Sequence, residues 1–495
     1  MATAAMELRT QAQPRAWWST RGFALAAVLA TAIPLLWPPF PPLTDALEHA
    51  GRFRMMLDGN ATGPLAQWYT ITWKLVGNMG CDVIVALLGP LIGLEPAVKL
   101  VAIGIVMLTA AGCLAISRVA HGQVSPFALF ALPLVYNHSF HMGFLNFSLA
   151  MALALNAFAL WLWMAGHRWR GVVFVPIALS IWGSHVFGWG VLCVIGFAAE
   201  WSRTRNPFRA AMQCWPFAAP LPVMLLWRSA SAGETFGFFE LQSKLIALLM
   251  SFRDSWFMVD FLTFAVVLGA LAFGVRRATS VPSVAWAAVA LLGVFAALPI
   301  WLMGSAFADT RAAPFVLMLA LLALRPADAR QATPVAWAAF AFCTLRIAAT
   351  TASLALASQA QAREVRALDF IPVGARVVQF VSPNCADGWR MARLDHIGGL
   401  AQVRRRAFTN SQFPDIGSTL LSKHYPAAGR FIEDPSHLLR CDGGVGLRKR
   451  LDAVPWHAFD RLWLVDIPEG APAALPGLTL LWSDGDSAVY RVERR

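Results

Sequence analysis

Charged residues are scarce in this chain and make up only 14% of its 495 residues. A soluble protein of this size carries about a quarter charged residues. The deficit is confined to residues 22–356, where long apolar runs follow one another, and ordinary mixed sequence comes after them. This distribution excludes a single soluble domain. It predicts a polytopic α-helical membrane protein with a C-terminal soluble α/β domain.

The sequence also lacks the motifs of several common function classes. There is no Rossmann fingerprint, P-loop or Ser-His-Asp elbow, and Gly443-Gly444-Val445-Gly446 lacks the strand-to-helix context that would make it more than a turn. No spacing matches a zinc motif such as HExxH. The net charge of +12 comes without a basic groove interleaved with aromatics, so nucleic acid is not an expected partner.

Cysteines are few, and most of the seven lie in or beside apolar runs, where they behave as small hydrophobes. Only Cys385 and Cys441 belong to the C-terminal part. In an oxidising compartment these two are disulfide candidates, and two free thiols are an equally open alternative, because a sequence does not give their separation.

Eleven apolar segments are predicted to be transmembrane helices, although several are shorter than the roughly 20 residues that cross a bilayer squarely. They comprise residues 22–36, 98–117, 126–136, 142–165, 172–183, 187–199, 210–227, 257–273, 284–303, 312–324 and 335–354. A further apolar segment, 81–94, would put later basic loops on the wrong side if it crossed the membrane. It is therefore predicted to be interfacial or re-entrant on the outer face.

The basic loops predict the orientation, because positive charge marks the cytoplasmic side. The basic N-terminus, 1–21, starts inside, and the other loops expected inside are 118–121, 167–170, 203–209, 276–277 and 325–330. The loops expected outside are 38–97, 136–141, 184–185, 228–255 and 304–309. An odd number of spans then places 358–495 outside as well. The predicted organisation is a cytoplasmic N-terminus, a bundle over 22–357 with the outer loop 38–97, and an extracytoplasmic α/β domain.

The C-terminal domain carries strand-like runs of β-branched and apolar residues, bounded by Gly, Pro and Asp. These runs are 376–381, 462–467, 478–482 and 488–492. The polar stretch 358–366 is expected to continue the last helix out of the membrane.

The most informative string lies in the first outer loop and reads PPLTDALEHAGRFRMML. Pro41 and Pro42 end the preceding helix, and Thr44 or Asp45 can cap a new one. The spacing then puts four polar side chains on one face of that helix: Asp45, Glu48, His49 and Arg52. Two alternatives stay open for this face, a functional site and an N-cap followed by a solvated charged surface.

Other polar side chains reach the outer boundary in the same topology: His138, His141, Asn146, His185, Arg253 and Arg311. Singly, each fits a hydrogen-bonded boundary residue, and together they predict a polar cleft at the membrane surface. Arg346 lies deep in the last span, where it is expected to pair with a carboxylate or a carbonyl of the bundle, or to line a wet cavity.

The order of parts resembles the GT-C class of membrane glycosyltransferases: a first span, a long outer loop with an early acidic residue, interfacial helices, a bundle, and an extracytoplasmic domain. The strings PPLTDALEH and YNHSFHMGFLNFSLAMALAL look like a largely uncharacterised bacterial subgroup of such proteins. Many GT-C enzymes place two adjacent acids in this loop, whereas here Asp45 stands alone and Glu48 follows a turn later.

The resemblance implies a sugar donor on a polyprenyl phosphate or diphosphate in a bacterial inner membrane. The acceptor would be a cell-envelope lipid, glycan or protein. Asp45 would act as general base, with Glu48 and His49 beside it. Arg311, His185 and Arg253 would stabilise the departing phosphate. The remaining residues expected to contact substrate are Arg52, His138, His141 and Asn146. No cofactor is expected, and a divalent ion held by Asp45 stays open.

Two rival functions remain open. A transporter or flippase of lipid-linked substrates predicts internal duplication and charges across the bundle midplane, and neither is evident in the sequence. A non-catalytic scaffold or assembly protein of the same fold is the other, because fold does not fix function.

Overall fold

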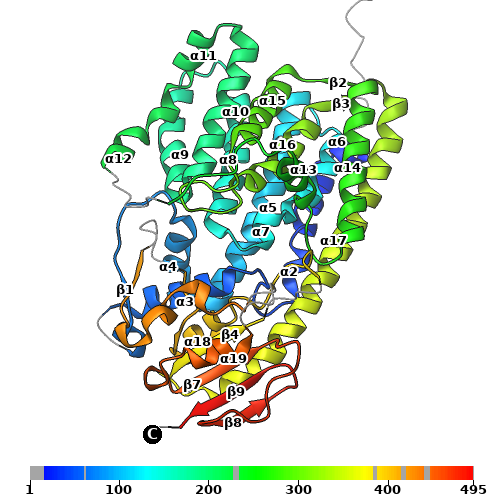
Figure 1. Cartoon of the computed structure of the whole chain (residues 1–495). Coiled ribbons are helices and arrows are strands. Elements are labelled where there is room, and N and C mark those ends of the chain that lie inside the picture. Colours follow the sequence, from blue (N-terminus) through cyan, green and yellow to red (C-terminus); the bar gives the residue numbers. More distant parts are fainter. Residues whose placement is uncertain are drawn as a thin grey trace, which may run out of the picture.

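The computed structural model describes residues 16–60, 63–226, 233–382, 387–413, 420–439 and 446–493. It is mostly helical, with a β-sheet formed by the C-terminal region at one end of a helical bundle (Figure 1). The helical class and the C-terminal α/β region are as expected. Cys385 and Cys441 lie outside the described residues.

Among the described residues, four helices are long and apolar enough to cross a membrane, rather than the eleven expected. They are α5 (Leu94–His121), α8 (Leu145–Trp163), α14 (Phe257–Arg277) and a last helix comprising α17 (Ala329–Val365) with its extension η5 (Arg366–Phe370). The remaining apolar segments form shorter helices.

Proline explains why three of the expected spans are broken, because it cannot donate the backbone hydrogen bond that continues a helix. Pro34 begins the second half of the first span, Pro133 that of 126–136, and Pro216 that of 210–227. The pieces are α1 (Arg21–Ala30), α2 (Ile33–Leu36), α6 (Phe127–Ala131), η3 (Leu132–Tyr136), α11 (Pro207–Gln213), η4 (Trp215–Ala218) and α12 (Leu221–Leu226).

Four other expected segments correspond to single helices: α9 (Arg170–Ser184), α10 (Val186–Thr204), α15 (Pro282–Ala297) and α16 (Ala308–Leu322). The turn predicted between α9 and α10 is confirmed, and His185 caps α10 by accepting a 3.1 Å hydrogen bond from the backbone of Phe187. Segment 81–94 forms α4 (Gly80–Ile92), and α13 (Leu241–Met250) is a helix within an expected outer loop.

Several segments that the charge pattern predicts to be cytoplasmic lie together at one end of the bundle. Ser19 accepts a 3.2 Å hydrogen bond from the backbone of Val124, and β2 (Ala278–Ser280) pairs antiparallel with β3 (Leu324–Pro326). Figure 1 shows β2, β3 and α11 at the end opposite the C-terminal sheet. All of these segments are expected on the cytoplasmic side.

The C-terminal sheet has five strands in the order β5-β4-β7-β9-β8. The strands are β4 (Arg376–Val381), β5 (Phe408–Thr409), β7 (Arg461–Val465), β8 (Leu478–Ser483) and β9 (Ala488–Val492). β4 runs parallel to β5 and β7, while β9 is antiparallel to β7 and β8. The four predicted strands are confirmed, and β5 escaped prediction because two residues give no periodic signal.

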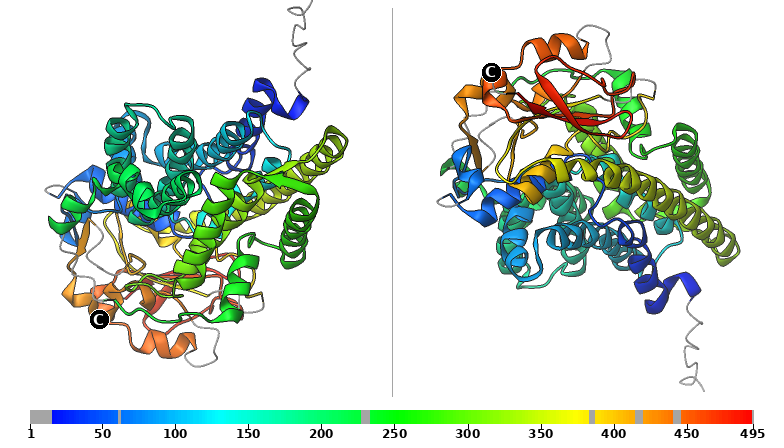
Figure 2. Two further views of the ribbon diagram at one scale, coloured as in Figure 1. Left: turned by 90° about the horizontal axis from the view of Figure 1, so that it is seen from above. Right: turned by 90° about the horizontal axis from the view of Figure 1, so that it is seen from below.

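Shorter elements complete the described chain: η1 (Trp17–Ser19), α3 (Ala46–Asp58), η2 (Pro64–Gln67), β1 (Tyr69–Ile71), α7 (His138–His141), α18 (Gly398–Arg405), β6 (Leu421–Lys423), η6 (Pro426–Ile432), η7 (Asp434–Ser436), α19 (Leu447–Asp452) and η8 (Trp456–Ala458). Helix α17 continues past the predicted span 335–354 to Val365, as expected for the stretch that joins the bundle to the sheet. Figure 2 shows this long, yellow-green helix from two further directions.

Two contacts bind the loop 38–97, which is predicted to lie outside, to the C-terminal region. β1 pairs antiparallel with β6, with Thr70 opposite Ser422. α3 packs against α18, where an added Cβ at Gly399 would lie 2.0 Å from the carbonyl oxygen of Leu47, and one at Gly51 would lie 1.9 Å from Oε1 of Gln402. Any side chain at Gly399 would therefore force the two helices apart.

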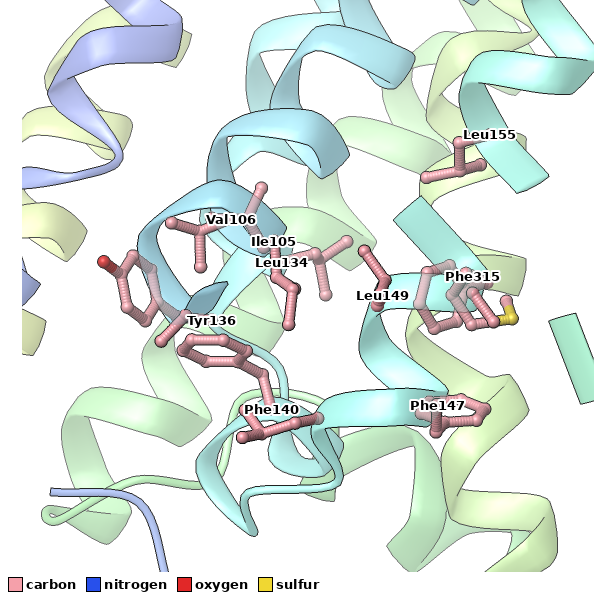
Figure 3. Close-up of a cluster of buried hydrophobic side chains, with 14 of the residues drawn as sticks. Ile105, Val106, Leu134, Tyr136, Phe140, Phe147, Leu149, Leu155 and Phe315 are labelled. Carbon is pink, nitrogen blue, oxygen red and sulfur yellow. The ribbon is translucent and has the colours of Figure 1, made fainter. Parts of the chain in front are cut away.

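Apolar packing positions the short helix α7 beside the start of α3. A buried cluster joins side chains of α5, η3, α7, α8 and α16 (Figure 3). Tyr136 and Phe140 lie edge to face within it, with ring centroids 5.5 Å apart. The Tyr136 hydroxyl donates a 2.6 Å hydrogen bond to the carbonyl of Thr31. This packing fixes the backbone of α7, which contacts the start of α3.

We predict that Gly399→Ala lowers the free energy of unfolding by about 1–3 kcal/mol, the usual cost of overpacking. The measurement is the thermal unfolding midpoint of the purified protein in detergent. Gly104→Ala is the control, because an added Cβ there meets nothing within 4 Å. Equal midpoints for the two variants would contradict a tight contact between α3 and α18.

Candidate functional site

Asp45 lies at the start of α3 but does not act as its cap through the side chain, which accepts no capping hydrogen bond. Its backbone N–H donates to the carbonyl of Met142 at 2.7 Å, and Thr44 donates to that of His141 at 3.2 Å. The chain of α7 thus holds the Asp45 backbone and leaves its carboxylate free to face the C-terminal region.

This close approach needs glycine at residue 143. Gly143 has a φ of +85°, in the left-handed region, and an added Cβ would lie 2.6 Å from the backbone nitrogen of Ala46. Gly143, which follows His138 and His141 in the sequence, therefore allows α3 to pack closely against α7.

Three carboxylates surround the imidazole of His396, which lies just before α18. Its Nε2 is 3.6 Å from Oδ1 of Asp45, and its Nδ1 is 3.5 Å from Oε2 of Glu48 and 3.7 Å from Oδ1 of Asp434. Glu48 is fully buried, and neither of its carboxylate oxygens has a hydrogen-bond partner among the described residues. The alternative of a solvated charged face on α3 is wrong, because the C-terminal region covers that face.

Burial and mutual charge shift the proton affinities in this cluster. Burial raises the pKa of Asp45 to about 7 and that of Asp434 to about 6. For His396, burial alone would lower the pKa, but the carboxylates of Glu48, Asp434 and Asp45 together raise it to about 10. Asp45 can therefore accept a proton near neutral pH.

His49 belongs to the same region but meets aromatic neighbours. Its ring centroid is 5.3 Å from that of Phe413 and 6.3 Å from that of Phe53. Burial holds the pKa of His49 well below its ordinary value, so the ring is neutral. Phe413 also packs at 4.9 Å from the His396 ring and gives the cluster an apolar wall.

Arg311, in α16, carries a guanidinium that forms no ion pair or hydrogen bond with the described part of the chain. It stacks 4.2 Å from the ring centroid of Phe144, and its charge acts on both Asp45 and His185. A stacked guanidinium keeps its donors available for an anion such as a phosphate.

Two of the predicted binding residues serve the packing instead. The Arg52 guanidinium pairs with the buried carboxylate of Asp82 in α4, and the Asn146 amide donates to the same carboxylate at 3.0 Å. The side-chain oxygen of Asn146 accepts a 2.6 Å bond from the backbone of Cys81. Arg52 and Asn146 thus join α3, α4 and α8.

A second polar network connects the bundle with residues 388–393. Arg393 pairs with Asp254 at 2.7 Å and contacts Nδ1 of His141 at 3.0 Å. Arg253 donates to the carbonyls of Trp389 and Gly388 at 2.7 and 2.9 Å. His141 and Arg253 are therefore engaged in contacts that fix the C-terminal region on the bundle.

His138 and Arg346, the last two polar residues considered in the sequence, differ in whether they have hydrogen-bond partners. Both ring nitrogens of His138 are buried without a hydrogen-bond partner among the described residues, and its ring packs 5.8 Å from Phe307. Arg346 pairs with the Asp260 carboxylate and donates to the carbonyl of Phe252 at 2.7 Å, which confirms the expected carboxylate and carbonyl partners.

Sequence reasoning missed the half of the site that the C-terminal region provides: His396, Asp434 and Arg393. Two acid–histidine pairs in the sequence could have indicated this half of the site: Asp395 with His396, and Asp434 with His437. Ligand atoms of His396, Asp434 and His437 lie within 4.8 Å of one another, so this is also where the described residues could hold a metal ion.

Comparisons with protein-family models, with curated proteins and with solved structures found no match for this chain.

We predict that Arg393→Gln lowers the free energy of unfolding by about 3–5 kcal/mol, because Asp254 would be left buried without its cation. Arg390→Gln is the matched control: its pair with Asp387 is exposed and should contribute less than about 1 kcal/mol. Thermal and denaturant unfolding of both variants measure the difference. An unchanged stability of Arg393→Gln would refute the role of this network.

Proposed function

We propose that this chain is a membrane glycosyltransferase of the GT-C type. It would transfer a hexosyl or pentosyl group from a polyprenyl phosphate or diphosphate to a cell-envelope acceptor, at the outer face of a bacterial inner membrane. One observation carries the proposal: the buried Asp45 carboxylate is not used as a helix cap and faces the junction between the apolar bundle and the C-terminal region.

The proposed chemistry assigns one task to each free group. Asp45 accepts the proton of the acceptor hydroxyl while the acceptor oxygen attacks the anomeric carbon. The bond from that carbon to the phosphate oxygen breaks, and its electron pair leaves with the phosphate. Arg311 supports this step, because its unpaired guanidinium can receive the growing negative charge.

The proposed membrane arrangement keeps all eleven spans. The shorter apolar helices would lie beside the four long ones, within a bundle whose N-terminus is cytosolic and whose C-terminal sheet is extracytoplasmic. The gathering of basic loops at the end opposite the sheet supports this orientation.

Asp45→Asn tests the enzyme assignment. We expect envelope glycan transfer to fall by about 10²–10⁴-fold, the usual contribution of a general base. Mass spectrometry of envelope glycans measures this, in a strain that lacks the native gene and carries either form. The matched control is Asp369→Asn, at an exposed residue of η5, which should leave transfer unchanged. Full transfer by Asp45→Asn at normal protein levels would exclude Asp45 as base.

One observation favours the alternative of a non-catalytic scaffold. Asp45 is only 7% exposed and Glu48 is fully buried, so the described conformation offers an acceptor little access. A scaffold predicts that Asp45→Asn still supports the assembly of its partners. The enzyme predicts that the variant protein accumulates normally and that its transfer falls by about 10²–10⁴-fold.

Cysteine labelling tests the orientation. A membrane-impermeant maleimide should label Asp369→Cys in spheroplasts with an intact inner membrane. It should label Arg325→Cys, in β3, only after permeabilisation. The parent chain without an introduced cysteine gives the background. Labelling of Arg325→Cys alone in the intact preparation would invert the topology and remove the proposed site from the outer face.

A further inference from the structure

The distances around His396 Nδ1 have the size of the edges of a metal coordination polyhedron. With metal–ligand bonds of about 2.1 Å, two ligand atoms of a tetrahedral site lie about 3.4 Å apart. Nδ1 is 3.5 Å from Oε2 of Glu48 and 3.7 Å from Oδ1 of Asp434. The same distances are long for hydrogen bonds of a charged pair, which are typically about 2.7–2.9 Å.

The groups that face this space form no hydrogen bond with the described residues, although Oδ1 of Asp434 also lies 3.4 Å from Nδ1 of His437. Nδ1 of His396, both carboxylate oxygens of Glu48 and Oδ1 of Asp434 are buried and have no hydrogen-bond partner among the described residues. Glu48 is 0% exposed and His396 is 6% exposed, so water is largely excluded from the ligand atoms. A buried carboxylate without hydrogen bonds is costly, and a bound cation removes that cost.

The surrounding chain holds the backbone of the segments that carry these three side chains. Both ring nitrogens of His437 face carbonyl oxygens, Nε2 that of Asp395 at 2.8 Å and Nδ1 that of Asp434. His437 therefore positions the two segments that carry His396 and Asp434, and its own nitrogens are occupied. On the opposite side, the amide of Gln412 donates to the backbone carbonyl of Glu48 at 3.2 Å.

We propose that Glu48 Oε2, His396 Nδ1 and Asp434 Oδ1 form a binding site for a divalent transition-metal ion of the Zn²⁺ type. One imidazole and two carboxylates form a ligand set that suits Zn²⁺, and three protein ligands leave a coordination position open. The site goes beyond the proposed glycosyl transfer and does not depend on it. Because Glu48 lies in α3 and the other two ligands lie in the C-terminal region, the ion joins the outer loop to that region.

The second ring nitrogen of His396, Nε2, faces a carboxylate, as is common for histidines that bind metals. A metal-bound histidine usually donates its second N–H to a carboxylate, which orients the ring. Nε2 of His396 faces Oδ1 of Asp45 at 3.6 Å. Asp45 would thus be the orienting carboxylate of the metal site.

The full-length protein in detergent, stripped with a chelator and dialysed, provides the test with Zn²⁺ alone. We expect elemental analysis and calorimetry to give one tightly bound Zn²⁺ per chain. Glu48→Gln removes a ligand at nearly constant volume and should weaken binding by more than about 100-fold, since loss of an outer contact alone costs 10–100-fold. The matched control, Glu364→Gln, changes a buried carboxylate of α17 outside the site and should bind as the parent does.

A thermal readout keeps the test decisive if Glu48→Gln folds poorly. Zn²⁺ should raise the unfolding midpoint of the parent and of Glu364→Gln, and should not raise that of Asp434→Asn, whose side chain is 18% exposed. Asp45→Asn should keep the bound Zn²⁺ with at most about 100-fold weaker affinity. Absence of stoichiometric Zn²⁺, or equal binding by Glu48→Gln, overturns the site whatever the outcome of the transfer assay.

Discussion

The contact between α3 and α18 is the constraint on which the rest of the structure depends. Glycines at both surfaces let the two backbones approach until no side chain fits between them. Because α3 also rests on α7 through the Asp45 and Thr44 amides, the loop 38–97 is held between the bundle and the C-terminal region. Acidic side chains that would otherwise face water are thereby enclosed and must find partners within the protein.

The regular elements were largely predictable from the sequence. The strands β4, β8 and β9 follow runs of β-branched and apolar residues, and helices such as α9, α10 and α15 follow apolar segments flanked by charge or proline. The lengths of the spans were not predictable to the same degree. An apolar run such as 126–136 gives the same composition whether it is one helix or two, and only the position of Pro133 distinguishes them.

The candidate site was predictable only in part, for a physical reason. Helical spacing correctly placed Asp45 and Glu48 on one face of α3, but spacing cannot tell whether water or protein covers that face. His396 and Asp434 arrive through tertiary packing of a distant segment, which leaves no local pattern. Arg52 and Asn146 lie in the expected region, but both bind the carboxylate of Asp82. They do so because a buried carboxylate needs hydrogen-bond donors.

The continuity of α17 has a mechanical consequence. This one helix runs from the apolar bundle to Val365 and continues into η5, so a change in its tilt would displace the start of the C-terminal region. A helix longer than the local hydrocarbon thickness tilts to fit it. In the proposed membrane setting, a change in lipid thickness would then change the tilt of α17. That change would displace the segments that carry His396 and Asp434.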